Sequence, residues 1–364
     1  MDKNLIDKDW KYLCLYLPEN LSELAKATRA VQRWRHVKNG EELLRVILAY
    51  AMEDLSLRST AAWSTQAALE LKDTSVLHRL RQAPPLLERV LAHLLMHRLR
   101  AEPAPGPEFR INDATVLSLP GSEGTDWRLH AVYDPAQACL RRVEVTDQRG
   151  GERLDRDRPR RGDVVCGDRG LAHARGIHAV SQAGAYVLLR MHWQNIRLHD
   201  VQGQAVDMEK TLKRAEAGET GTIVYVPLED QPPVRARLLI RPLPTEAASR
   251  NRQRLRRKAA QKGRTPSATA LRLAGYFCVL TTLPEDLARN DVVLELYRLR
   301  WQIEVFFKRC KGLLHLGQLR AFDPDLVRTY CLAKLIVVAL IQCLHEEAIA
   351  FSPWGVPRCR RRAA

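Results

Sequence analysis

Residues 297–311 read YRLRWQIEVFFKRCK, and their apolar positions recur at helical spacing. At roughly 100° per residue, four polar side chains fall within about 60° of one another: Tyr297, Arg300, Glu304 and Lys311. A separate sector, centred roughly 100° away, is apolar: Leu296, Leu299, Ile303, Phe306, Phe307, Cys310, Leu313 and Leu314. The pattern predicts a helix with one buried face and, beside it, a stripe that sets a carboxylate among cations. Taken alone, this stripe is better explained as a solvated face that carries an i,i+4 ion pair between Arg300 and Glu304.

Two aspartates in apolar surroundings favour a different interpretation of that carboxylate. Asp113 lies in the middle of a largely apolar strand, and Asp168 lies just past the end of a short buried strand, before a glycine. A buried carboxylate is costly unless it is paired, hydrogen-bonded or bound to a cation, so these residues and Glu304 predict a shared cation site. Phosphodiester cleavage needs such a site, because two Mg²⁺ ions roughly 3.5–4 Å apart stabilise the entering and leaving oxygens. Mg²⁺ prefers carboxylate and water oxygens as ligands.

The spacing around Glu304 matches a known signature. Residues 297–311 contain the Y-(2)-R-(3)-E-(6)-K spacing of bacterial insertion-sequence transposases of the insertion sequence four family. The contexts Asp113-Ala114-Thr115 and Asp168-Arg169-Gly170 are also similar to those of this family. The chain resembles the family from about residue 21 to the C-terminus, although Leu171 stands where an aromatic residue is common.

This resemblance implies a fold and a catalytic site. The implied fold class is α/β, with a ribonuclease H-like catalytic core that contains a mixed five-stranded sheet and helices. A β-rich insertion would interrupt the core, and an all-helical N-terminal domain would precede it. Asp113, Asp168 and Glu304 would form a DDE triad that holds two Mg²⁺ ions, for which Mn²⁺ can substitute. Transposon-end phosphates would be contacted by the remaining signature side chains: Tyr297, Arg300 and Lys311.

In related transposases an aromatic side chain near the strand before this helix stacks on a flipped base. Phe277 or its neighbour Tyr276 stands near that place, and Trp193 is a further candidate. Stacking on an aromatic ring compensates part of the cost of unstacking the base. A core aromatic in a buried strand is an equally good interpretation of Phe277.

Composition and periodicity divide the chain into four parts. We expect a helical DNA-binding domain at 1–105, the catalytic core at 106–195 and 276–350, a β-rich basic insertion at 196–275, and a basic tail at 351–364. A period of two predicts strands at 109–119, 127–133, 140–145, 163–166, 185–191, 222–226, 234–240 and 276–282. Helices are expected at 173–182, 292–314 and 324–347. Short helices around 56–62 and 73–80 indicate either a helix-turn-helix-like unit or a plain helical bundle.

The charge of the chain favours a polyanionic partner. Lys and Arg number 58 against 42 Asp and Glu, a formal net charge of +16, and neutralising phosphates releases condensed counterions. In the most basic run, contact with the DNA backbone is favoured over a solvated loop; its cations include Arg254, Arg256, Arg257 and Lys258. With the resemblance, the expected partner is double-stranded DNA, as terminal inverted repeats and as target.

Cysteine spacing and hydropathy bear on the compartment. The eight cysteines form no C-x-x-C pair, which argues against a zinc or redox site. No signal peptide follows Met1, and the longest apolar stretch, residues 335–341, is too short to span a bilayer. We therefore expect a cytoplasmic, nucleoid-associated protein with no membrane partner.

The expected activity is cut-and-paste excision and strand transfer of an insertion sequence through a DNA hairpin, by two-metal hydrolysis and transesterification. Synapsis of two transposon ends implies a dimer. Two alternatives stay open: a ribonuclease H-like nuclease without strand transfer, and a non-catalytic DNA-binding remnant of a transposase.

Overall fold

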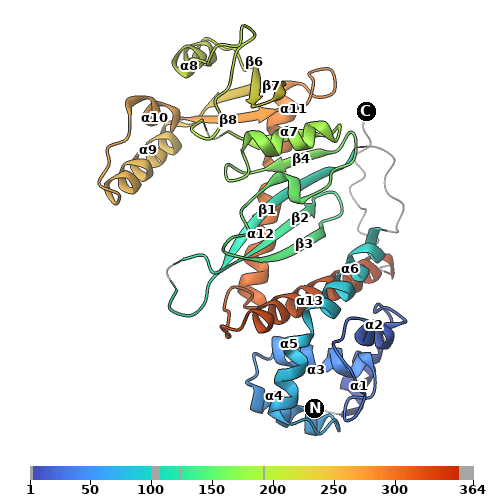
Figure 1. The fold of residues 1–364 in the computed structure, drawn as a ribbon. Coiled ribbons are helices and arrows are strands. Elements are labelled where there is room, and N and C mark those ends of the chain that lie inside the picture. Colours follow the sequence, from blue (N-terminus) through green and yellow to red (C-terminus); the bar gives the residue numbers. More distant parts are fainter. Residues whose placement is uncertain (1–2, 100–106, 123, 192, 352–364) are drawn as a thin grey trace.

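The computed structural model describes residues 3–99, 107–122, 124–191 and 193–351. The molecule is elongated, with helices at one end, a sheet in the middle and the insertion at the other end (Figure 1). Most of the predicted basic tail at 351–364 lies outside the described residues.

Helices form the N-terminal part of the chain, as predicted. Their bounds are α1 Lys3–Cys14, α2 Leu21–Ala27, α3 Gly40–Met52, α4 Leu57–Gln66, α5 Asp73–Gln82 and α6 Pro84–Leu99. Asn39 caps α3 by accepting a hydrogen bond from the Glu42 amide, and Ser56 caps α4 by accepting one from the Ser59 amide. The helices α4 and α5 pack against each other at the place expected for a helix-turn-helix-like unit. That they read DNA stays a prediction.

One sheet of eight strands runs through the described part of the chain in the order β3-β2-β1-β4-β5-β8-β7-β6. The first five strands are β1 Phe109–Leu117, β2 Trp127–Asp134, β3 Cys139–Asp147, β4 Val164–Gly167 and β5 Tyr186–Arg190. β1, β2 and β3 pair antiparallel, whereas β1, β4 and β5 pair parallel. A short 3₁₀-helix, η1 Leu154–Arg156, precedes β4. These strands are the mixed five-stranded core that the resemblance implied.

The insertion is joined to this sheet edge to edge. Its strands are β6 Gly221–Leu228 and β7 Gln231–Pro242, and β8 Tyr276–Thr281 follows it in the chain. β8 pairs with β5 on one side and with β7 on the other, so the strands of the insertion continue the core sheet. The insertion also contains α8 Met208–Glu216, α9 Thr245–Ala260 and α10 Ala268–Leu273. Its basic run is therefore a helix, α9, and the alternative of a solvated loop was wrong.

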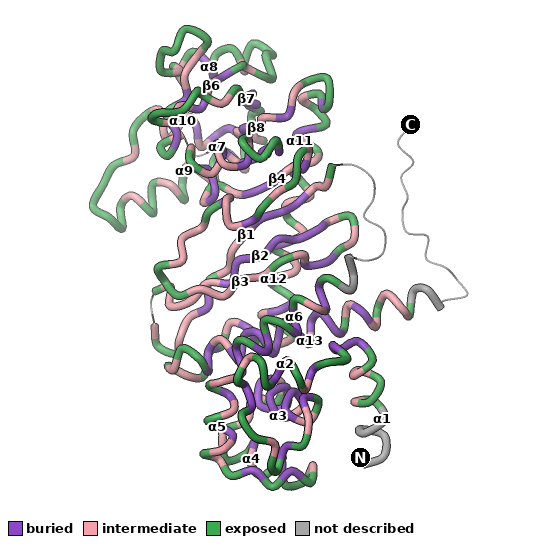
Figure 2. Tube along the Cα trace, turned by 45° about the vertical axis from the view of Figure 1, so that its right-hand side comes forward, coloured by how far each residue is buried: buried purple, intermediate pink, exposed green. Residues whose placement is uncertain are grey.

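Helices cover both faces of the sheet, and buried residues, in purple, run along β1, β2 and β4 in Figure 2. On one face lie α6 and three C-terminal helices, α11 Asn290–Arg298, α12 Trp301–Leu313 and α13 Pro324–Phe351. On the other face lie α7 Ala174–Gln182, which is the predicted crossover helix, and the helices α8 and α10. Successive side chains of a strand point to opposite faces of the sheet. Ile111 of β1 therefore packs into the core under α6 and the C-terminal helices, and the residues before and after it point to the other face.

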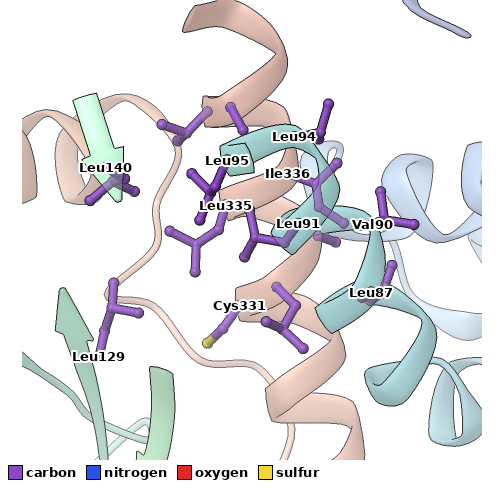
Figure 3. Close-up of a cluster of buried hydrophobic side chains, with 14 of the residues drawn as sticks. Leu87, Val90, Leu91, Leu94, Leu95, Leu129, Leu140, Cys331, Leu335 and Ile336 are labelled. Atoms are coloured by element: carbon purple, nitrogen blue, oxygen red, sulfur yellow. The ribbon is translucent and has the colours of Figure 1, made fainter. Parts of the chain in front are cut away.

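The helices α6 and α13 connect the N-terminal helices to the sheet. Figure 3 shows Leu91 and Leu95 of α6 against Leu335 of α13, with Leu129 and Leu140 of the sheet beside them. All five side chains are buried. By length and hydropathy alone, the segment Pro324–Ala348 of α13 could cross a membrane. However, 78% of the 18-residue window that gives this hydropathy is buried inside the protein. It is a core helix of this fold.

A buried lysine ties α13 to the turn after α3. Lys334 is only 1% exposed, and its ammonium lies 3.2 Å from Asp54 Oδ1 and donates to the Leu314 carbonyl at the end of α12. The Tyr330 hydroxyl donates to the same Asp54 oxygen at 2.7 Å. Buried charges of this kind are retained only when paired and hydrogen-bonded. The network fixes the C-terminal end of α12 relative to the N-terminal helices.

We expect His130 to make the stability of the metal-free protein fall in acid. This β2 side chain is 8% exposed, and its ring hydrogen-bonds to the Thr146 hydroxyl at 2.9 Å. Burial first, and the charge of Arg156 second, lower its pKa from 6.5 to about 4. Above pH 6.5 the ring is neutral in both the folded and the unfolded protein. Between pH 6.5 and about 4, only the unfolded protein binds a proton at this ring. Stability should therefore fall by roughly 3 kcal/mol over this window.

Urea unfolding in EDTA at several pH values measures the contribution of His130 to the free energy of unfolding. The variant His130→Gln removes the titrating group and keeps a partner for Thr146, so its free energy of unfolding should lose that part of the pH dependence. Identical pH profiles for the variant and the wild type would show that His130 does not cause the loss.

Candidate active site

The register between β1 and β4 sets two of the predicted acids level with each other. Asn112 pairs with Gly167, and the two strands run parallel, so the next residues are Asp113 and Asp168. Asp113 follows Ile111 by two residues, and Asp168 follows Cys166 by two; both of these residues belong to the core under α12. Strand alternation therefore directs both aspartates toward the helix that carries Glu304.

The two aspartates influence each other electrostatically, as their level positions on neighbouring strands imply. Burial first, and the negative charge of Asp168 second, raise the pKa of Asp113 to about 7, although the Ala114 amide and Arg300 oppose the rise. Asp113 Oδ1 accepts a hydrogen bond from the Ala114 amide at 2.8 Å, and Asp168 Oδ1 accepts one from the Gly170 amide at 2.7 Å. Two close carboxylates in a partly buried place repel each other unless a cation neutralises them.

Glu304 reaches the same place from α12. The predicted single helix at 292–314 is in fact two helices, α11 and α12, which are joined by a tight turn at Leu299 and Arg300. Hydrogen bonds between residues three apart in the chain keep the turn nearly helical. In one of them the Arg300 amide donates to the Tyr297 carbonyl at 3.1 Å. The four signature residues therefore stay along one side, although Tyr297 belongs to a different helix from Glu304.

Arg300 connects two of the acids. Its guanidinium lies 3.7 Å from Asp113 Oδ2 and donates to Glu304 Oε1. The i,i+4 ion pair expected from the sequence is thus present. Glu304 is 45% exposed, whereas Arg300 is only 14% exposed and also approaches Asp113. An open groove of about 580 Å³ runs beside them, and its lining includes Asp113, Glu304 and Lys311. The Lys311 ammonium donates to the Val116 carbonyl of β1 at 2.8 Å, which holds α12 against the sheet.

The donor set of this site fits divalent cations, although it is not arranged as a ready metal cluster. Within the described residues, no three His, Cys, Asp or Glu side chains converge closely enough to hold an ion. Glu304 is turned onto Arg300, while Asp113 and Asp168 follow paired residues on neighbouring strands. Carboxylates are the ligands that Mg²⁺ and Mn²⁺ prefer, and a cation would offset both the burial and the Asp168 charge that raise the pKa of Asp113.

Aromatic side chains flank the acids on the side of β8. The rings of Phe277 and Tyr297 meet edge to face, with 5.4 Å between centroids, and Arg300 lies over the Tyr297 ring at 5.7 Å. Tyr297 is 5% exposed, and its hydroxyl has no hydrogen-bond partner in the described part of the chain. A buried hydroxyl without a partner is costly, which is typical of a group that serves a ligand.

The other predicted aromatics lie elsewhere. Tyr276 points to the opposite face of the sheet, where its hydroxyl donates to Glu216 of α8. Trp193 packs against that same second core. Of the three candidates, only Phe277 lies beside Tyr297 and Arg300. Base stacking by Phe277 stays a prediction, as does DNA contact by the four basic side chains of α9, which are all exposed.

A family model described as the transposase DDE domain matches residues 104–340, a span that contains all three acids. The chain belongs to the DDE transposase family. The putative transposase InsL of insertion sequence element IS186A from Escherichia coli strain K12 is 34% identical over 96% of this chain and 97% of its own length. The transposase of IS421 from Escherichia coli is also 34% identical, with the same coverage.

More distant relatives extend the match. The transposase of IS231F from Bacillus thuringiensis subsp. israelensis is 25% identical over 89% of this chain and 76% of its own length. A solved piggyBac transposase synaptic complex with hairpin DNA superposes with a TM-score of 0.47 and 8% identity over 93% of this chain and 75% of that chain. These sequence matches confirm the insertion sequence four family and the ribonuclease H-like fold class of this transposase.

Sequence reasoning missed two arginines at the site of this transposase. Arg190 ends β5, lies over the Phe277 ring at 5.5 Å, and has a buried Nε without a hydrogen bond among the described residues. Arg169 directly follows Asp168; partial desolvation and then the charge of Arg190 lower its pKa. Neither has a carboxylate within ion-pair distance in the described ranges. The one sequence signal for Arg190 is a cation at the end of an apolar strand.

Proposed function

We propose that this transposase excises and inserts its element by cut-and-paste transposition through a DNA hairpin. The proposal is supported by the placement of Asp113, Asp168 and Glu304 at one end of the sheet, with Arg300 between Asp113 and Glu304 and a groove beside them. Each step would be an in-line displacement at phosphorus, so one site serves them all: water attacks first, the freed 3′-hydroxyl then attacks the opposite strand, and after the hairpin reopens it attacks target DNA.

The three acids would hold the divalent cations. Two bound cations, Mg²⁺ or Mn²⁺, supply charge stabilisation at the entering and leaving oxygens and lower the pKa of attacking water. In the free protein Arg300 donates to Glu304 and lies 3.7 Å from Asp113 Oδ2. A DNA phosphate that binds the Arg300 guanidinium would release Glu304 toward the two aspartates. Arg300 would then both position the scissile phosphate and leave Glu304 able to bind a cation.

The partners follow from the same proposal. Terminal inverted repeats and target DNA would bind along the basic side chains of the site and the insertion, and the N-terminal helices at 1–105 would serve as a DNA-binding domain. Synapsis of two ends needs at least a dimer. The transposase would act in the cytoplasm, on the nucleoid.

We expect Arg190 to contact a phosphate of the transposon end. Replacing it by alanine should weaken end binding about tenfold and reduce the slope of log K against log salt by about 1. Fluorescence anisotropy across a salt series measures both quantities. Arg298→Ala is the matched control, because Arg298 is 75% exposed and paired with Glu295 on α11. An unchanged salt slope in Arg190→Ala would remove this residue from the interface.

A strand-transfer assay with pre-cleaved ends tests the proposed function. The transposase should join a duplex with a free 3′-hydroxyl end to plasmid DNA in Mg²⁺. Cleavage of uncut ends without any joining would contradict the proposal and support a nuclease. End binding with neither reaction would support a non-catalytic remnant.

A further inference from the structure

The loop between β3 and η1 sets a fourth carboxylate, Glu152, beside the proposed cation site. Glu152 Oε2 lies 2.3 Å from the point that a Cβ on Gly170 would occupy, and Asp168 Oδ1 lies 3.2 Å from the same point. The two carboxylate oxygens are therefore no further apart than the sum of these distances. They approach across a residue with no side chain, and any other residue at position 170 would displace Glu152.

Glu152 forms one long ion pair, with Arg128, among the described residues. Its second oxygen, Oε1, lies 3.8 Å from Arg128 Nε, which is beyond hydrogen-bond length. The Arg128 guanidinium donates to the Gly150 carbonyl at 3.1 Å, so this side chain holds the backbone of the loop in place. Glu152 is 28% exposed, and its Oε2 lies on the side of the loop where Gly170 and Asp168 are. The ion pair with Arg128 involves Oε1 and not Oε2.

We propose that Glu152 is a fourth acidic ligand of the divalent cation held by Asp113 and Asp168. This inference rests on the proposed function, because it concerns the same cations. Asp168 and Glu152 both place a carboxylate oxygen close to Gly170, and Asp113 is level with Asp168 on the next strand. A hard cation needs several oxygen ligands, and the missing Cβ at Gly170 leaves room for Glu152 to supply one.

Binding of Mn²⁺ to the full chain without DNA, followed by electron paramagnetic resonance of the free ion, tests the proposal. Glu152→Gln should raise the Kd for Mn²⁺ about tenfold or more. Gly170→Ala should do the same, because its Cβ pushes the carboxylate away, and the double variant should be no worse than either single one. Glu219→Gln is the matched control, since it also removes a carboxylate paired with one arginine, here Arg214 at 3.4 Å. Its Kd should equal that of the wild type.

A Glu152→Gln protein that binds Mn²⁺ like Glu219→Gln would overturn the proposal. Asp168→Asn then separates two failures. If Asp168→Asn weakens binding, only the role of Glu152 is wrong; if it does not, the proposed cation site fails as well. Thermal unfolding in EDTA guards against a merely structural effect: Glu152→Gln should unfold no lower than the wild type, because it removes a repulsion. A weaker Kd together with a lower unfolding temperature would also contradict the proposal.

Discussion

Glu304→Gln should abolish cleavage of the transposon end while leaving end binding within about twofold of the wild type. We expect the cleavage rate to fall by at least about 10³-fold, as for other residues that act only on the transition state. The glutamine amide can still contact Arg300, so α12 should keep its place. The loss would therefore report the missing negative charge in the cation site. Single-turnover cleavage in Mg²⁺, with anisotropy for binding, gives both values.

Glu295→Gln is the matched control for this experiment. Glu295 lies on α11, is exposed, and pairs with Arg298, so its replacement removes the same charge outside the groove. Its cleavage rate should not change. If Glu304→Gln still cleaves at a rate near that of the wild type, the assignment of the third acid is wrong.

Neutralising the exposed cations of α9 should have the second largest effect. A variant with glutamine at four positions is expected to bind the transposon end about 10³-fold more weakly near 0.1 M salt, and its salt slope should fall by about 4, since each contact releases about one counterion. The four positions are Arg254, Arg256, Arg257 and Lys258. The helix should stay folded, because its inner side is fixed separately: Ala248 is buried, and Arg252 donates to the Leu271 carbonyl.

A second variant in the same insertion provides the control. Glutamine at Lys210, Lys213 and Arg214 of α8 removes a similar charge from a different helix. This variant should lose less than about tenfold in affinity and keep most of its salt slope. Equal losses in both variants would mean that net charge, rather than contact by α9, controls binding.

The positions of the acids along the chain could be predicted, but not their neighbours. Asp113 and Asp168 stand out because carboxylates are rare in apolar strands, and Glu304 because of the residues spaced around it. The pairing of Asn112 with Gly167, which sets the two aspartates level, depends on contacts between strands far apart in the chain. Local sequence patterns do not contain this information. For the same reason the sequence did not reveal that β6 and β7 extend the core sheet.

Two further features left little trace in the sequence. The turn at Leu299 and Arg300 separates α11 from α12 without any glycine or proline, so periodicity predicted one helix. Glu152 lies in a polar segment after Gly151, where a carboxylate is unremarkable, and its place beside Asp168 depends on the fold. Residues that meet only after strands pair are the ones that sequence reasoning missed here.

The most direct test of the account is the position of Mn²⁺ in crystals of the transposase bound to its transposon end. Anomalous scattering locates the ion independently of the protein atoms. We predict Mn²⁺ peaks within about 2.2 Å of carboxylate oxygens of Asp113, Asp168 and Glu304, with Arg300 turned from Glu304 to a phosphate. Peaks remote from these three side chains, with Glu304 still held by Arg300 at a bound DNA end, would contradict it.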